Sequence, residues 1–332
     1  MTPTTLLLAR RDVAALLSLD ECIAAVQHAF LLHSEGRALG PGVLGVPVRG
    51  GGFHIKAAGL PLGRTYFAAK TNANFSDNPT RFGLPAIQGV IVLADGENGT
   101  MLAVMDAIEI TLLRTGAATA VAAKYLARRD SRIATVCGCG NQGRVQLRAL
   151  ARVLPLDAAY AVDRETARAQ RFAAELGPEL SLDIQLASDL ATAAHASDVI
   201  VTCTPSRKPI LDRAAVRPGT FVAAVGADSE DKQELDPTLF LGNTVVVDVL
   251  EQCASIGELH HALVAGCVTR ADVHAELGDV VVGRRPGRTS DEEITIFDST
   301  GTALQDVAAA AVVYEKAVAL GSGLAVQLGE CP

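Results

Sequence analysis

A glycine-rich turn between an apolar run and a helical run restricts the fold of this chain more than any other feature. Gly138, Gly140 and Gly143 form a G-x-G-x-x-G pattern directly after the β-branched run at 132–137, and a helix-compatible run follows from 144 to 154. In this order the first glycine forms a tight turn, the second lets a pyrophosphate approach the backbone, and the third packs the helix on the strand. The helix presents its first N–H groups to phosphate. The pattern predicts a dinucleotide-binding loop.

A carboxylate at a suitable distance supports this prediction. Asp163 ends the next apolar run and follows Gly143 by twenty residues. A carboxylate there accepts hydrogen bonds from the ribose hydroxyls and repels a 2′-phosphate. The sequence therefore favours NAD as the cofactor, and NADP stays open because Arg164 stands beside the acid. The residues expected to contact the cofactor in this region are Gly138, Gly140, Asn141, Gln142, Gly143, Asp163 and Arg164.

Apolar, β-branched runs recur through the middle of the chain, with helix-compatible segments between most of them. Near-continuous apolar strands are typical of a parallel sheet that is buried on both faces. Six such strands match a full Rossmann count, so we expect an α/β protein with a doubly wound Rossmann dinucleotide-binding domain. The six runs lie at 132–137, 158–162, 198–203, 220–225, 244–249 and 293–297.

The first 125 residues predict a different arrangement, in which one helix precedes several glycine-broken strands. Ser18 and Glu21 form a capping box in front of an apolar helical face. The last thirty residues read as one Ala-rich helix and a tail. A chain of 332 residues is long for one core and suits two lobes. Strands are expected at 53–56, 66–72 and 88–95, and a long helix rich in small residues at 106–128.

Composition and charge argue against several classes of protein. The net charge of −8, without a Lys/Arg cluster, disfavours a nucleic-acid surface. No window approaches the roughly 18 unbroken apolar residues of a membrane span. The apolar run at the amino end is too short for a signal peptide, so a cytoplasmic protein is expected. The cysteines and histidines lack metal-ligand spacing. Seven scattered cysteines predict small core residues, namely Cys22, Cys137, Cys139, Cys203, Cys253, Cys267 and Cys331.

Four motifs in the chain resemble signatures of the ornithine cyclodeaminase/μ-crystallin family. They are L-R-T-G-A-A at 113–118, V-C-G-C-G-N-Q at 136–142, G-A-D-S-E-D-K-Q-E-L-D at 226–236, and F-D-S-T-G-T-A-L-Q-D at 297–306. The resemblance implies a homodimer of two-domain subunits. An α/β substrate-binding and dimerisation domain would comprise residues 1–127 with 303–332, and the Rossmann domain residues 128–302.

The chemistry of an α-amino acid and the family resemblance together predict the substrate site. A substrate carboxylate needs a cation, and the planar guanidinium of Arg114 matches it bidentately. Lys70 corresponds by resemblance to the family's active-site lysine, which binds the carboxylate or polarises a carbonyl or imine. Lys56 is expected to reach the same site. Arg49 is the nearest counterpart of the family's upstream arginine.

Asp228 follows a strand end at the carboxyl edge where doubly wound sheets bind ligands. By resemblance it is the acid/base group that takes a proton from the substrate amine. The residues alone leave open a helix N-cap role, because the run from Ser229 looks helical. The remaining cofactor contacts are expected at Thr115, Thr202, Thr204, Val225 and Ser299.

Three functions remain open at this point. The first is an NAD(P)-dependent imine reductase or amino-acid dehydrogenase that moves a hydride at the α-carbon of an amino acid or its (cyclic) imine. The second is a cyclodeaminase, in which NAD is recycled in place and ammonia leaves. The third is a cofactor-loaded binding protein without catalysis. We favour the first, because the substrate strand departs from the cyclodeaminase pattern, and the third is disfavoured by the presence of Lys70, Arg114 and Asp228 together.

Overall fold

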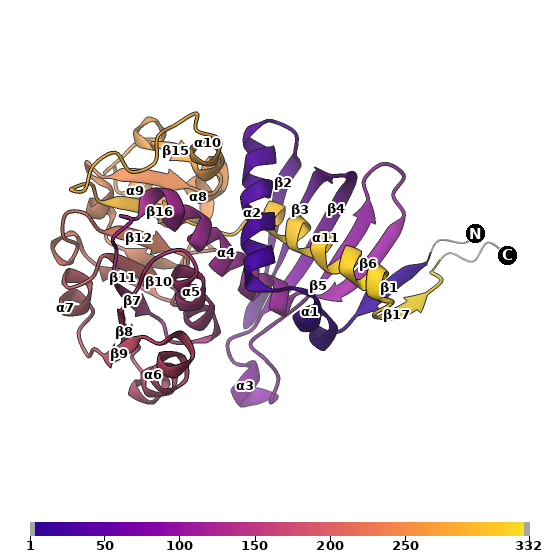
Figure 1. Cartoon of the computed structure of the whole chain (residues 1–332), viewed down its shortest axis with the longest axis horizontal. Helices are drawn as coiled ribbons and strands as arrows, with labels where there is room; N and C mark the ends of the chain where they lie inside the picture. The colour runs from indigo at the N-terminus through magenta and orange to yellow at the C-terminus, as the bar shows by residue number, and fades with distance from the viewer. Residues whose placement is uncertain (1–3, 329–332) are drawn as a thin grey trace. The chain divides into compact units, whose positions relative to one another are not determined.

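The computed structural model describes residues 4–328, which form two compact units (Figure 1). One unit is Met1–Arg114 with Thr302–Pro332, and the other is Thr115–Gly301. The division falls within helix α4 (Ile108–Leu126), whereas the family resemblance implied a boundary after residue 127. The binding role of each domain stays a prediction.

The unit Thr115–Gly301 is built on an eight-stranded sheet in which every neighbouring pair is parallel. The order is β15-β14-β16-β12-β10-β7-β8-β9, so the strands from β9 to β12 run 3-2-1-4-5 in chain order, as in a Rossmann sheet. The predicted fold class is confirmed, and all six expected strands are present. The strands are β7 (Ile133–Cys137), β8 (Ala158–Val162), β9 (Asp183–Leu186), β10 (Val199–Thr202), β12 (Phe221–Ala224), β14 (Thr244–Val247), β15 (Ala275–Glu276) and β16 (Thr295–Asp298).

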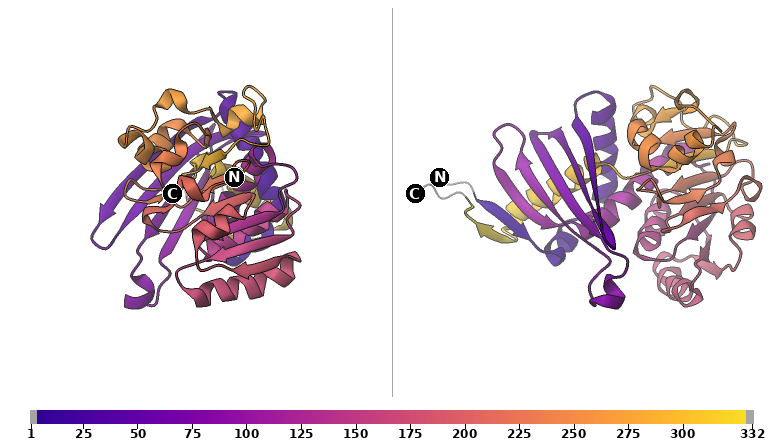
Figure 2. Two further views of the ribbon diagram at one scale, coloured as in Figure 1. Left: turned by 90° about the vertical axis from the view of Figure 1, so that its left-hand side faces the viewer. Right: turned by 180° about the vertical axis from the view of Figure 1, so that it is seen from behind.

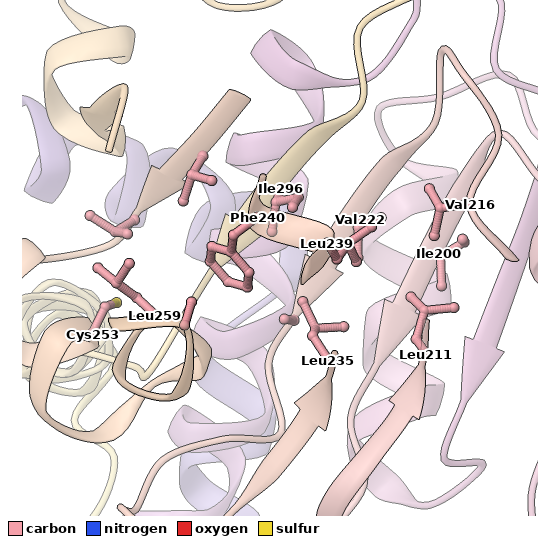
Figure 3. Packing of buried hydrophobic residues seen from close by; sticks show 14 of the residues in the cluster. Ile200, Leu211, Val216, Val222, Leu235, Leu239, Phe240, Cys253, Leu259 and Ile296 are labelled. Carbon is pink, nitrogen blue, oxygen red and sulfur yellow. The ribbon is translucent and has the colours of Figure 1, made fainter. Parts of the chain in front are cut away.

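Helices and short turns surround this sheet, and a small parallel sheet of two strands lies at its side. Apolar side chains of the central strands, such as Ile200, Val222 and Ile296, pack against Leu239 and Phe240 of the turn η2, which spans Pro237–Phe240 (Figure 3). The helices are α5 (Asn141–Ala151), α6 (Thr166–Leu180), α7 (Leu190–His195), α8 (Leu250–Ile256), α9 (Glu258–Val264) and α10 (Leu277–Val281), and the remaining elements are η1 (Arg213–Ala215), η2 (Pro237–Phe240), η3 (Arg270–Asp272), β11 (Arg207–Leu211) and β13 (Gln233–Leu235).

The other unit contains a seven-stranded sheet in the order β17-β1-β6-β5-β4-β3-β2. Only the pair β1–β6 is parallel among its described strands. The expected capping box is confirmed, since Ser18 and Glu21 begin helix α2. The elements are β1 (Thr5–Leu8), α1 (Arg10–Leu16), α2 (Leu19–Ser34), β2 (Leu39–Val48), β3 (Gly51–Leu62), β4 (Arg64–Asn74), α3 (Asn78–Arg81), β5 (Ile87–Asp95), β6 (Met101–Asp106), α11 (Ala303–Leu320) and β17 (Leu324–Val326).

The two faces of this seven-stranded sheet are different. Helix α11 packs against α2 and against β3, β4 and β5 on one face, and Figure 2 (right) shows the sheet from the opposite side. Side chains alternate along each strand. In β4, Tyr66 and Lys70 point toward α11 and are buried, whereas Phe67 lies on the outer face and is exposed. The inner face is therefore a core that contains a lysine, and the outer face is uncovered in the single chain.

Two further sequence expectations concern cysteines and membrane spans. Cysteines 22, 137, 139 and 253 are buried and 203 and 267 are half-buried, while Cys331 lies outside the described residues. Within residues 4–328, no single helix is long and apolar enough to cross a membrane, and only the bent pair of α1 and α2 reaches that length and composition together.

Candidate functional site

The glycine loop joins β7 to α5 as the sequence predicts. Gly138 has φ +104°, and a Cβ on it would lie 2.8 Å from the carbonyl oxygen of Cys203. A Cβ on Gly143 would lie 2.1 Å from the carbonyl oxygen of Gly138. The fold itself therefore requires the first and third glycines. A Cβ on Gly140 would meet nothing within 4 Å, so the open space beside the second glycine fits the approach of a pyrophosphate.

The loop also positions the carboxylate of Asp163. Its Oδ2 accepts a hydrogen bond from the N–H of Cys139 at 2.9 Å, and its Oδ1 accepts one from the N–H of Glu165 at 2.9 Å. Each carboxylate oxygen has a second lone pair, so the acid can hold the loop and still accept from a ribose hydroxyl. Asp163 is half-buried and Arg164 is exposed. The residues around Gly140 and Asp163 fit the adenosine half of a dinucleotide.

The strand-end residues expected at the other half of the cofactor lie along one edge of the sheet. Thr202 ends β10, Val225 directly follows β12, and Ser299 directly follows β16. Thr202 pairs with Ala224, which pairs in turn with Asp298, so the three carboxyl ends are neighbours. Thr204 follows β10 in the chain, and Thr115 belongs to α4 and is buried.

Asp228 lies in the segment that follows β12, and its side chain is 46% exposed. The helix expected from Ser229 is wrong, because residues 229–231 form a bend and a turn and the next regular element is β13. The N-cap alternative for Asp228 is therefore excluded. The carboxylate instead forms an ion pair with Nζ of Lys232 at 2.5 Å. Sequence reasoning did not consider Lys232 as a partner of Asp228, although the two residues are only four positions apart.

The other unit places two of the expected cations beside one acid. Lys70 and Arg114 are 1% and 6% exposed, and both contact Asp306 of α11. Nζ of Lys70 lies 2.8 Å from the carboxylate, and Nε of Arg114 lies 3.2 Å from it. Nη1 of Arg114 also donates to Oε1 of Gln305 at 2.9 Å. The two cations carry two positive charges when both are protonated, and the one carboxylate supplies a single negative charge. One positive charge therefore remains for an anionic ligand to balance.

Lys56 joins these cations, whereas Arg49 does not. Lys56 is directly opposite Lys70 in the pairing of β3 with β4, and it is also buried. Like charges in such positions repel each other. An anion bound between the two lysines would reduce this repulsion. Arg49 lies in the exposed turn between β2 and β3. Its expected contact with the substrate therefore stays a prediction.

Burial and neighbouring cations change the acidity of Lys70. Burial above all, together with the charges of Arg114 and Lys56, lowers the pKa of the Lys70 ammonium from 10.5 to about 7, against the opposing effect of Asp306. Lys70 therefore changes protonation near neutral pH. Perturbed pKa values of this kind are common at functional sites.

Sequence reasoning missed Asp306 and Gln305 as site residues. Both belong to the fourth motif, but they start an Ala-rich helix whose residues read as ordinary core. The signal that could have found Asp306 is the carboxylate itself, since an acid in a run of buried Ala and Val needs a cationic partner.

These features define a Rossmann-type dinucleotide-binding protein. They are a parallel sheet, a glycine turn with open space at its second glycine, and a carboxylate beside that turn. Comparison with known families agrees with this class and narrows it. Residues 4–321 match the model of the "Ornithine cyclodeaminase/mu-crystallin family". The chain belongs to this family.

Several similar proteins are named as enzymes. Alanine dehydrogenase of Archaeoglobus fulgidus is 42% identical over 320 residues, which cover 96% of this chain and 97% of that protein. The structure of an archaeal alanine dehydrogenase dimer with bound NAD is similar with a TM-score of 0.93 and 40% identity, covering 98% of this chain and 100% of that one. Δ1-Pyrroline-2-carboxylate reductase of Thermococcus litoralis, in complex with NADH and L-proline, has a TM-score of 0.92 and 34% identity, covering 97% and 100%.

Proposed function

We propose that this protein is an NAD-dependent oxidoreductase that transfers a hydride at the α-carbon of an amino acid or of its imine, cyclic imines included. The observation that carries the proposal is the buried pair of Lys70 and Arg114 with one shared counter-charge, Asp306, since such a site suits a single carboxylate. The glycine loop and Asp163 support the cofactor assignment. The relatives that bind NAD or NADH agree with it.

In the proposed mechanism the protein orients the substrate and moves one proton. Arg114 holds the substrate carboxylate through its planar fork, and Lys70 adds a second cation. Asp228 takes a proton from the amine as the α-carbon loses its hydride, and it returns the proton when an imine is reduced. The nicotinamide, when bound, accepts or supplies the hydride. The products of oxidation are the imine and the reduced cofactor, so atoms and electrons balance.

A substrate panel tests the function. We expect net oxidation of NADH with pyrroline-2-carboxylate, or with pyruvate and ammonia, in assays that record absorbance and ammonia together. Release of ammonia from ornithine without any net change in NADH absorbance would replace the proposal with a cyclodeaminase. Binding of NADH without turnover on the panel would indicate a binding protein.

Cofactor preference provides a prediction for Asp163. Asp163→Ala is expected to lower the ratio of kcat/KM for NAD to that for NADP by about tenfold, because the carboxylate that accepts from the ribose and repels a 2′-phosphate is lost. Steady-state kinetics with both cofactors measure the ratio. Asp183→Ala, an exposed acid at the start of β9, is the control and should leave it unchanged. An unchanged ratio in Asp163→Ala would discredit the ribose role.

The acidity of Lys70 predicts a dependence on pH. The free enzyme determines the pH profile of kcat/KM, and the protonated form of Lys70 attracts a carboxylate. Because the pKa of Lys70 is lowered to about 7, kcat/KM should fall as pH rises through that value. An arginine at position 70 stays charged throughout this pH range. In Lys70→Arg the fall of kcat/KM near pH 7 should therefore be absent, whatever the absolute activity of the variant. If kcat/KM of that variant still falls near pH 7, the fall belongs to another group.

We further propose a homodimer that covers the outer face of the seven-stranded sheet. Leu44, Val46, Phe53, Phe67 and Val90 lie on this face by strand register and are each 38–57% exposed. Contiguous apolar surface of this kind marks an interface. The archaeal alanine dehydrogenase is a dimer.

Phe67→Asp should shift the mass measured by light scattering from dimer to monomer, whereas Lys124→Asp on α4 should not. A wild-type monomer would refute the dimer.

A further inference from the structure

A buried carboxylate ties together the two segments that leave neighbouring strands β10 and β12. Glu234 is 0% exposed. Its Oε1 accepts from the N–H of Thr204 at 2.6 Å, and its Oε2 accepts from the N–H of Gly226 at 3.0 Å. Thr204 and Gly226 each stand two residues beyond the end of their strand. One side chain therefore holds both segments at the carboxyl edge of the sheet.

Two more buried carboxylates hold Glu234 in place. Glu258, at the start of α9, accepts from the N–H of Glu234 at 2.6 Å and from the N–H of Leu235 at 3.0 Å. Asp298, at the end of β16, accepts from the N–H of Glu258 at 3.2 Å and from the N–H of Leu259 at 2.8 Å. A series of acid-to-backbone bonds thus leads from β16, the neighbour of β12, to the Glu234 side chain.

Packing leaves no room for another arrangement at Gly226. A Cβ on this residue would lie 2.3 Å from Oε2 of Glu234 and 2.5 Å from the carbonyl oxygen of Thr204. The absence of a side chain at 226 is therefore what lets the carboxylate reach both N–H groups. Burial raises the pKa of the Glu234 carboxyl, and the bonds from Thr204 and Gly226 oppose that rise. Losing one of these bonds would leave a buried polar group unsatisfied.

We propose that Glu234 is a positioning residue for the nicotinamide half of the site, acting through the Thr202–Thr204 segment and through the loop 226–234 that carries Asp228. The proposal rests on the proposed function. Glu234 accepts from the backbone N–H groups of both segments, so it is placed to act through them. Its loss should therefore impair the nicotinamide end and the proton transfer, while the glycine loop and Asp163 still bind the adenosine end.

Glu234→Gln tests this directly, because the amide keeps one acceptor oxygen and turns the other into a donor that faces an N–H group. Titration with ADP-ribose and with NADH separates the two halves of the cofactor. We expect the Kd for ADP-ribose to stay within about twofold, while the Kd for NADH rises and kcat falls, each by about tenfold or more. The proposal would be overturned if the variant lost affinity equally for ADP-ribose and NADH. It would also be overturned if both affinities and kcat stayed normal.

Asp198→Asn is a control away from the nicotinamide edge, since Asp198 is also a buried carboxylate that accepts two backbone N–H bonds, from Arg132 at 2.7 Å and Ile133 at 3.0 Å, and it pairs in addition with two arginines. These bonds lie at the amino ends of the strands, so this variant should lower Tm without separating the two affinities. Gly226→Ala disturbs the same contact without removing the acid, and it decides the question if Glu234→Gln fails to fold. If the wild-type protein binds neither ADP-ribose nor NADH, the proposed function fails and the positioning role fails with it.

Discussion

Asp228→Asn should reduce kcat by about a thousandfold while the Kd for NADH stays unchanged. The amide has nearly the same shape as the acid but cannot take a proton from the substrate amine. The side chain is 46% exposed and pairs with Lys232, so replacement should cost little stability. Stopped-flow measurement of hydride transfer, with a separate fluorescence titration of NADH, distinguishes loss of chemistry from loss of binding.

The same loop offers a control for Asp228. Asp231 is an exposed acid that pairs with Arg207, and Asp231→Asn removes the same charge three residues away. This control should turn over at close to the wild-type rate. Normal turnover by Asp228→Asn would show that the assigned base is wrong. A comparable loss in both variants would attribute the effect to the charge of the loop rather than to one acid.

Arg114→Ala is expected to raise KM for the amino acid or imine and to lower kcat, each by about 10- to 100-fold. A charge-assisted contact that orients the carboxylate contributes to both quantities, because it binds the substrate and aligns its α-carbon. Asp306 keeps its contact with Lys70 in this variant, so the acid is not left without a partner. The Kd for NADH should be unaffected.

The control for Arg114 is an arginine of the same unit on the surface. Arg10 pairs with Glu109, and Arg10→Ala should leave KM and kcat as in the wild type. Arg114→Lys keeps the charge but loses the planar fork, so it should recover part of kcat/KM. An unchanged KM in Arg114→Ala would remove this residue from the substrate site.

Most of the Rossmann sheet could be predicted from the sequence because its central strands are buried on both faces. Their apolar runs leave a clear local signal, as at β7 and β10. Edge strands lack that signal. No such run occurs at β9, which is largely exposed, and three glycines and two prolines interrupt the apolar residues of β2.

The candidate site was partly predictable for the same kind of reason. The glycine loop and Asp163 lie close together in the chain, so their spacing alone revealed them. Lys70 was found through the family resemblance, and Arg114 also through the chemistry of carboxylate binding. Asp306 was missed because it meets Lys70 across 236 residues of sequence. The turn after Asp228 was misread because Glu234 and Glu258, which hold that segment, act through contacts that do not appear in local periodicity.

The sequence by itself determined the alternation of strands and helices, the glycine loop and its acid, because each depends on residues a few positions apart. Only the tertiary structure decided which charges are buried together. Pairing β3 with β4 brings Lys56 beside Lys70, and packing α11 on that sheet brings Asp306 to Lys70 and Arg114. Buried charges are stable only when a partner reaches them, and that partner is chosen by packing between distant segments rather than by neighbours in the chain.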